Sequence, residues 1–97
     1  MSGNQAGLIL PPQLTVENVE AVKELILNRL HEGGAEPECY AGDVKVIDAA
    51  GLQLLLALYK SAVREGKQVT IINPSPYLRK VFSCSGADKV LAIKEVG

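Results

Sequence analysis

The sequence predicts a single α/β domain with a mixed or largely parallel sheet, and two observations lead to this prediction. Short apolar or β-branched segments, such as Gln68–Asn73 (QVTIIN), alternate with longer segments in which apolar residues recur at helical spacing. A helix between two strands usually makes a crossover that leaves those strands parallel. The length of 97 residues also suits one domain with one core.

The N-terminal third is expected to hold one strand and one helix. Residues 1–6 are expected to be disordered, ahead of a single domain that spans residues 7–97. The apolar segment 7–10 (GLIL) precedes two prolines, which predicts an edge strand, because proline cannot donate to a strand ladder. Thr15 is the predicted N-cap of the first helix, and the glycines at 33–34 should end that helix. The apolar residues of this helix recur at Val16, Val19, Val22, Ile26 and Leu30.

The middle of the chain predicts two strands followed by a second helix. Residues 36–42 (EPECYAG) form a weak strand candidate, and residues 44–47 form a stronger one that ends at Asp48. The second helix is predicted from about Ala50 to Glu65. Its expected core face comprises Leu52, Leu55, Leu56, Tyr59, Ala62 and Val63.

The C-terminal third predicts a strand, a short helix and a last short element. The strand is Gln68–Asn73, and Pro76 suits the first turn of the helix that follows. That helix covers residues 77–83 and is ended by Gly86, after which residues 87–93 (ADKVLAI) form the last element.

One stripe of the second helix interrupts its polar face. Ala50, Leu54, Ala57 and Ser61 recur at helical spacing among polar residues, and Leu58 lies at the edge of that face. An exposed stripe of small residues with one leucine resembles a docking surface for another helix. The alternative is that a single exposed leucine has no function, since isolated surface apolar residues are common.

Composition argues against several classes of function. The net charge is −1 and the basic residues are scattered, so no nucleic-acid partner is expected. The longest apolar run, Leu54–Tyr59, is far shorter than the about 20 residues that span a bilayer, so no membrane insertion is expected. No signal peptide is visible, and Cys39 and Cys84 are expected to be buried small hydrophobes in a protein of the reducing cytoplasm.

No set of residues typical of catalysis or of metal binding appears, so we expect neither an enzyme nor a cofactor. His31, the one histidine, is interpreted as a solvated residue at the C-terminal end of the first helix. Tyr77, Arg79 and Lys80 either flank a partner surface or belong to a solvated helix.

The segment from residue 44 to residue 91 resembles the STAS domain. The matching positions are Asp48, Gly51-Leu52, Leu55-Leu56, Gly66, Asn73-Pro74-Ser75-Pro76 and Ser85-Gly86. STAS domains occur in bacterial anti-sigma factor antagonists, in sulfate-transporter tails and in a bacterial lipid-asymmetry transport component. The resemblance implies a four- to five-stranded sheet with helices mainly on one face, and a protein-binding role in signalling or transcription regulation.

The resemblance also identifies a missing switch. In antagonists with a phospho-switch, the position of Ala50 holds a serine that the anti-sigma factor phosphorylates, but neither Ala49 nor Ala50 has a hydroxyl group. Asp48 is then expected to serve as the N-cap of the second helix. The Tyr40-Ala41-Gly42 segment also departs from the Asp–Leu–Ser that the family often carries there. The partner-binding residues implied are Asp48, Ala49, Ala50, Leu54, Ala57, Leu58 and Ser61.

Two kinds of protein partner follow from this resemblance. One is an anti-sigma factor, a kinase of the GHKL type, to which the domain would bind without a serine phospho-switch. The other is a transporter ATPase subunit, if the chain is an accessory STAS subunit of a bacterial lipid transport system of the ABC type. The residues after Asp48 also resemble STAS proteins of chemotaxis gene sets.

Overall fold

The computed structural model describes residues 7–32 and 36–96. The expected disorder of residues 1–6 and the expected helix end at residues 33–34 lie outside these ranges. The described elements follow one another as strands alternating with helices. They are β1 (Gly7–Ile9), β2 (Gln13–Leu14), α1 (Val19–His31), β3 (Glu38–Tyr40), β4 (Val46–Ile47), α2 (Ala49–Arg64), β5 (Thr70–Ile72), α3 (Pro76–Ser85), the 3-10 helix η1 (Ala87–Lys89) and β6 (Ala92–Lys94).

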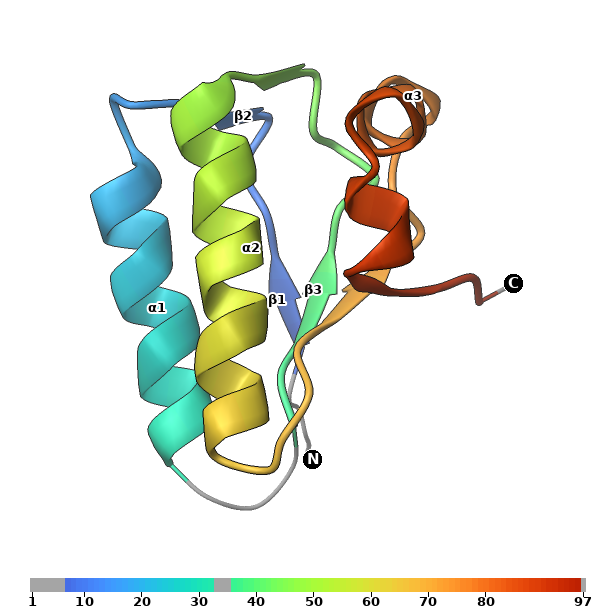
Figure 1. The fold of residues 1–97 in the computed structure, drawn as a ribbon. Coiled ribbons are helices and arrows are strands. Elements are labelled where there is room, and N and C mark those ends of the chain that lie inside the picture. The colour runs from blue at the N-terminus through green and yellow to red at the C-terminus, as the bar shows by residue number, and fades with distance from the viewer. Residues whose placement is uncertain (1–6, 33–35, 97) are drawn as a thin grey trace.

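Four of these strands form one sheet in the order β1-β3-β5-β6, and each neighbouring pair is parallel. The α/β prediction is therefore confirmed, and β1 lies at an edge as its following prolines predicted. The two remaining strands, β2 and β4, pair in parallel as a separate ladder, with Gln13 opposite Val46. This ladder lies at one end of the main sheet, where α2 begins (Figure 1).

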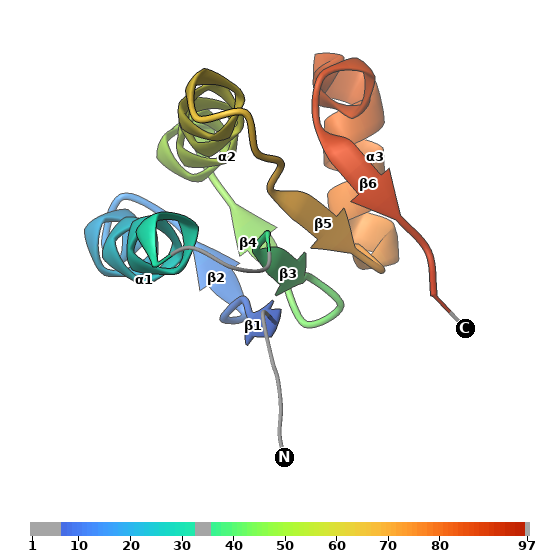
Figure 2. The ribbon, with the colours of Figure 1, turned by 90° about the horizontal axis from the view of Figure 1, so that it is seen from below.

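Helices α1 and α2 pack side by side on the same face of the sheet and run in the same direction (Figures 1 and 2). Leu8, Cys39, Ile71 and Ile93 share one row across the sheet, and all four belong to the hydrophobic core or pack against it. The neighbouring row points to the opposite face, where Ile9 is 76% exposed at the edge strand β1 but Ile72 on β5 is only 1% exposed. The face that α1 and α2 cover is the one with the larger helices, in agreement with the expected arrangement (Figure 2).

Helix α1 begins one turn later than the sequence predicts. Thr15 closes a separate turn: its carbonyl accepts from the Asn18 and Val19 amides, and its hydroxyl accepts from the Glu17 amide at 3.3 Å. Asn18 occupies the N-cap position instead, with its side-chain oxygen turned back to accept from the Thr15 amide at 3.0 Å. Because the turn precedes the helix, Val16 is 72% exposed and does not belong to the core.

The two cysteines have different environments, so the expectation that both are buried is wrong for one of them. Cys39 lies on β3 within the core, and desolvation by burial raises the pKa of its thiol to about 12. Cys84 is exposed on α3. It occupies the polar side of a helix whose buried residues are Leu78 and Phe82.

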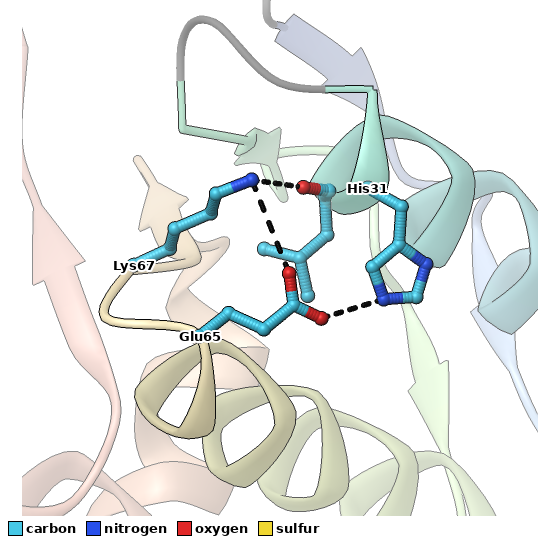
Figure 3. Close-up of polar contacts among 4 residues, drawn as sticks. His31, Glu65 and Lys67 are labelled. Carbon is cyan, nitrogen blue, oxygen red and sulfur yellow. Dashed lines mark hydrogen bonds and ion pairs between the residues drawn. The ribbon is translucent and has the colours of Figure 1, made fainter.

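The C-terminal ends of α1 and α2 are joined by side-chain contacts (Figure 3). His31 Nε2 pairs with Glu65 Oε2 at 2.6 Å, and Lys67 Nζ donates to the Leu30 carbonyl at 2.6 Å. A cation that binds a terminal carbonyl satisfies an acceptor that the helix itself leaves open. The His31 side chain is 55% exposed, which agrees with a solvated position at the helix end.

Candidate functional site

Asp48 joins the start of α2 to the turn before α1. Its Oδ1 accepts from the Gly51 amide at 2.9 Å, which confirms the predicted N-cap, and its Oδ2 accepts from the Val16 amide at 3.0 Å. These two bonds hold the pKa of the Asp48 carboxyl below its usual range, and the bond from Val16 has the larger effect. The carboxylate therefore links the start of α2 to the turn before α1.

Gly51 lets α2 start directly against the β2 backbone. A Cβ atom at this position would lie 2.1 Å from the Leu14 carbonyl oxygen and 2.8 Å from Cγ1 of Ile47. No side chain fits in that space without a shift of the backbone. In the sequence, Gly51 is only one of the positions that match the STAS domain, and the structure supplies the physical reason for glycine there.

A third connection reaches the same end of the molecule from α3. The Tyr77 hydroxyl accepts from the Ile47 amide at 3.1 Å, one residue before the cap of α2. Ser75 caps α3 by accepting from the Leu78 amide at 3.1 Å, and its hydroxyl donates to the Val44 carbonyl at 2.7 Å. The segments that follow β2, β4 and β5 are thus tied together, and we call this end of the molecule the apex.

Several exposed side chains of the apex are apolar, beside the exposed carboxylates of Glu17 and Asp48. Ala49 is exposed and Ala50 is half-buried, so the start of α2 presents methyl groups. Val16, Val46 and Tyr77 are 72%, 51% and 41% exposed. Val16 and Tyr77 are held by their bonds to Asp48 and Ile47, and the Val46 amide donates to the Pro12 carbonyl at 3.2 Å. Such a surface is suited to contact with another apolar surface.

A groove of about 290 Å³ runs between α1 and α2, starting beside the apex. We call it the α1–α2 groove. From α2 it is lined by the complete predicted stripe together with Gln53 and Leu58, and from α1 by one further row of residues. The lining residues are Ala50, Gln53, Leu54, Ala57, Leu58 and Ser61 of α2, and Val19, Glu20, Lys23 and Leu27 of α1.

The exposure predicted for the second helix is wrong at three positions. Leu54 and Leu58 are only 7% and 2% exposed, whereas Val63, expected in the core, is 55% exposed. Helix α2 packs against α1 as well as against the sheet, so its buried arc extends toward α1. Leu54 is therefore part of the floor of the groove and not an exposed anchor, while Ala57 is exposed as expected.

The α1 side of the groove was not predicted from the sequence. Val19, Lys23 and Leu27 recur every four residues next to the buried row of that helix. This spacing is visible in the sequence, but it does not distinguish a groove wall from the margin of a core face. Only the packing of α1 beside α2 identifies these residues.

None of the helices within residues 7–32 and 36–96 is long and apolar enough to cross a membrane. Within the same ranges, no three histidine, cysteine or acidic side chains are grouped so that they could hold a metal ion.

Comparison with known proteins gives one family and one fold. Residues 1–93 match the family model described as "Mlab, STAS domain". The fold is similar to the crystal structure of a "putative anti-sigma factor antagonist (tm1081)" from Thermotoga maritima, with a TM-score of 0.80 and 22% sequence identity over 96% of this chain and 82% of that one. An NMR structure of the protein TM1081 gives a TM-score of 0.79 at 22% identity, over 93% of this chain and 73% of that one. Among curated protein sequences, none matches significantly.

Proposed function

This chain belongs to the STAS domain family, and we propose that it is a non-enzymatic regulatory module that binds another protein through α2 and the apex. The observation that carries this proposal is the α1–α2 groove, because it places the predicted stripe of α2 in an accessible depression beside the apex. A groove with a leucine floor and an exposed alanine offers apolar area to a protein partner.

The same surface supports constitutive binding. A phosphate at a helix N-terminus is stabilised by the helix dipole and would change the charge of the docking surface. Ala49 and Ala50 cannot carry a phosphate, so this chain would bind its partner without a switch at that position. Ser75 is a poor replacement acceptor, because its hydroxyl is buried and bonded to both Val44 and Leu78.

The partner we favour is a cytoplasmic anti-sigma factor of the GHKL kinase type, so that the chain would act in transcription regulation in a bacterium. The fold shared with a protein described as a "putative anti-sigma factor antagonist" supports this choice. The family model described as "Mlab, STAS domain" favours a second candidate, an accessory STAS subunit of a bacterial lipid transport system of the ABC type. In that case the partner is a transporter ATPase subunit.

Co-expression separates the two candidates. The chain is produced together with the GHKL-type protein, or with the ABC-type ATPase, that its neighbouring genes encode, and complex formation is measured by size-exclusion chromatography. A stable complex with the GHKL-type protein supports regulation, and one with the ATPase supports transport. Failure to bind either protein contradicts both candidates.

A pair of α2 variants then tests the docking surface. Ala57→Arg places a large cation in the groove, whereas Val63→Arg places the same side chain on α2 outside the groove. Both positions are exposed, so both variants should fold. We expect Ala57→Arg to weaken the complex about 30-fold or more, the scale of an interface hot spot, and Val63→Arg to leave it unchanged. Equal affinities for the two variants would exclude the groove as the docking site.

A further inference from the structure

We infer that the α1–α2 groove receives a single amphipathic helix of the partner protein, antiparallel to α2, with acidic residues in its first turn and basic residues in its last turn. The inference rests on the proposed function of the groove as the docking site. It adds the class of the docked element, its direction and its charge pattern.

The shape of the groove fits one helix. It follows α2 from Ala50 to Ser61, a rise of about 16 Å or about three helical turns. Its floor contains Leu54 and Leu58, while Ala57 on the exposed side leaves room for the backbone of a neighbouring helix. A second copy of the same surface is a poor occupant, because two facing concave surfaces would leave a void between them.

The direction of the docked helix follows from the two helix dipoles. Both α1 and α2 begin at the apex and run away from it, so their positive N-terminal ends lie at the same end of the groove (Figure 1). A third helix that lies between them is stabilised when its negative C-terminal end is at the apex. The antiparallel orientation is therefore the favoured one.

The charges of the two groove ends agree with this direction. Near the apex, Glu20 lines the groove from α1. At the other end, α2 carries the exposed cations Lys60 and Arg64, which lie three residues after the lining residues Ala57 and Ser61 and therefore flank the groove.

The charges in the middle of the groove favour neither direction of the docked helix. There the exposed side chains of Lys23 and Glu24 have opposite charges on the same helix. A complementary partner helix thus needs basic residues opposite Glu20 and acidic residues opposite Lys60 and Arg64. In an antiparallel helix, these basic residues lie at the C-terminal end and the acidic residues at the N-terminal end, where each is also stabilised by that helix's own dipole.

Two synthetic peptides of about 16 residues test this inference. Both have one face of leucine and alanine; the first has an acidic first turn and a basic last turn, and the second has these charges exchanged. We expect the first peptide to bind in fluorescence anisotropy at least about fivefold more tightly, the effect of a few helix-end charges. In the chain with Glu20→Lys, Lys60→Glu and Arg64→Glu, the preference should reverse.

The direction is measured separately with a nitroxide label on the first peptide. A label at its C-terminus should broaden the amide signals near Ala50, and a label at its N-terminus should broaden those near Ser61. The inference is overturned if both peptides bind equally, if neither binds, or if the two labels act at the opposite ends. The proposed function would survive those results as long as Ala57→Arg still weakens binding of the natural partner and Val63→Arg does not.

Discussion

The two ends of the paired helices α1 and α2 are held together by different kinds of contact. At the apex, one carboxylate binds two backbone amides, and a glycine lets α2 touch the β2 backbone. At the opposite end, the base, the contacts are an ion pair between His31 and Glu65 and a bond from Lys67 to a helix carbonyl. The close backbone approach at Gly51 has no room for a larger residue, whereas contacts made by flexible, partly solvated side chains are readily replaced. The apex should thus be the rigid end, which suits a binding surface.

The strongest test of this comparison is Gly51→Ala. Its methyl group would overlap the Leu14 carbonyl oxygen, so either α2 or β2 has to move. We expect a loss of about 3 kcal/mol or more in the free energy of unfolding, at the upper end of the costs of overpacking. Urea denaturation measures it. A loss below about 1 kcal/mol would show that the apex is more adaptable than these contacts indicate.

Asp48→Ala should cause the second-largest loss in the free energy of unfolding. It removes the cap of α2 and the bond to the Val16 amide together, so stability should fall by less than for Gly51→Ala but by more than for any change at the base. Asp48→Asn is the matched control, because an amide oxygen can still accept one of the two bonds. If Asp48→Asn is as damaging as Asp48→Ala, the charge matters more than the cap.

The pH dependence of stability provides a third comparison. The pKa of Asp48 is lowered in the folded state, so its contribution is present above the ordinary pKa and is lost as the pH falls through the lowered folded value. The difference in denaturation midpoint between the wild type and Asp48→Ala should therefore shrink below about pH 4. A difference that stays constant down to pH 2 would mean that ionisation of Asp48 plays no part.

At the base, the effects should be small. The His31 and Glu65 side chains are 55% and 35% exposed, so solvent screens their attraction. A double-mutant cycle with His31→Ala and Glu65→Ala should give a coupling of about 1 kcal/mol or less. A coupling well above this range would place a rigid contact at both ends and remove the difference between them.

The smallest effects on stability are expected at two exposed positions of α2, one in the groove and one outside it. Ala57→Arg and Val63→Arg should each change stability by no more than about 0.5 kcal/mol, since both positions are exposed. Leu54→Glu, by contrast, would bury a charge in the floor of the groove and should be strongly destabilising. Thermal unfolding of the three variants distinguishes surface positions from the groove floor, and a mild effect of Leu54→Glu would contradict its placement there.

Local patterns in the sequence were sufficient for most of the elements. The periodicity of α2, the β-branched residues of β5 and the proline at the start of α3 each lie at the predicted place. The cap at Asp48 was also predicted, because a capping residue acts within its own helical turn. Thr15 failed as a cap, since a turn that bonds to Asn18 precedes α1 and competes with the helix.

What the sequence alone determined is the STAS resemblance, the stripe on α2 and the order of the strands and helices apart from β2, which was not predicted, and from the division of the last element into η1 and β6. The tertiary structure decided how far that stripe is buried, because the burial of a helical residue depends on which neighbours pack on each side. The predicted core face of α2 takes account of the sheet as its only neighbour. In the structure, α1 also packs against α2, so Leu54 and Leu58 are buried while Val63 is exposed. The groove itself needs residues from two helices about thirty positions apart in the chain, and no local periodicity brings such residues together.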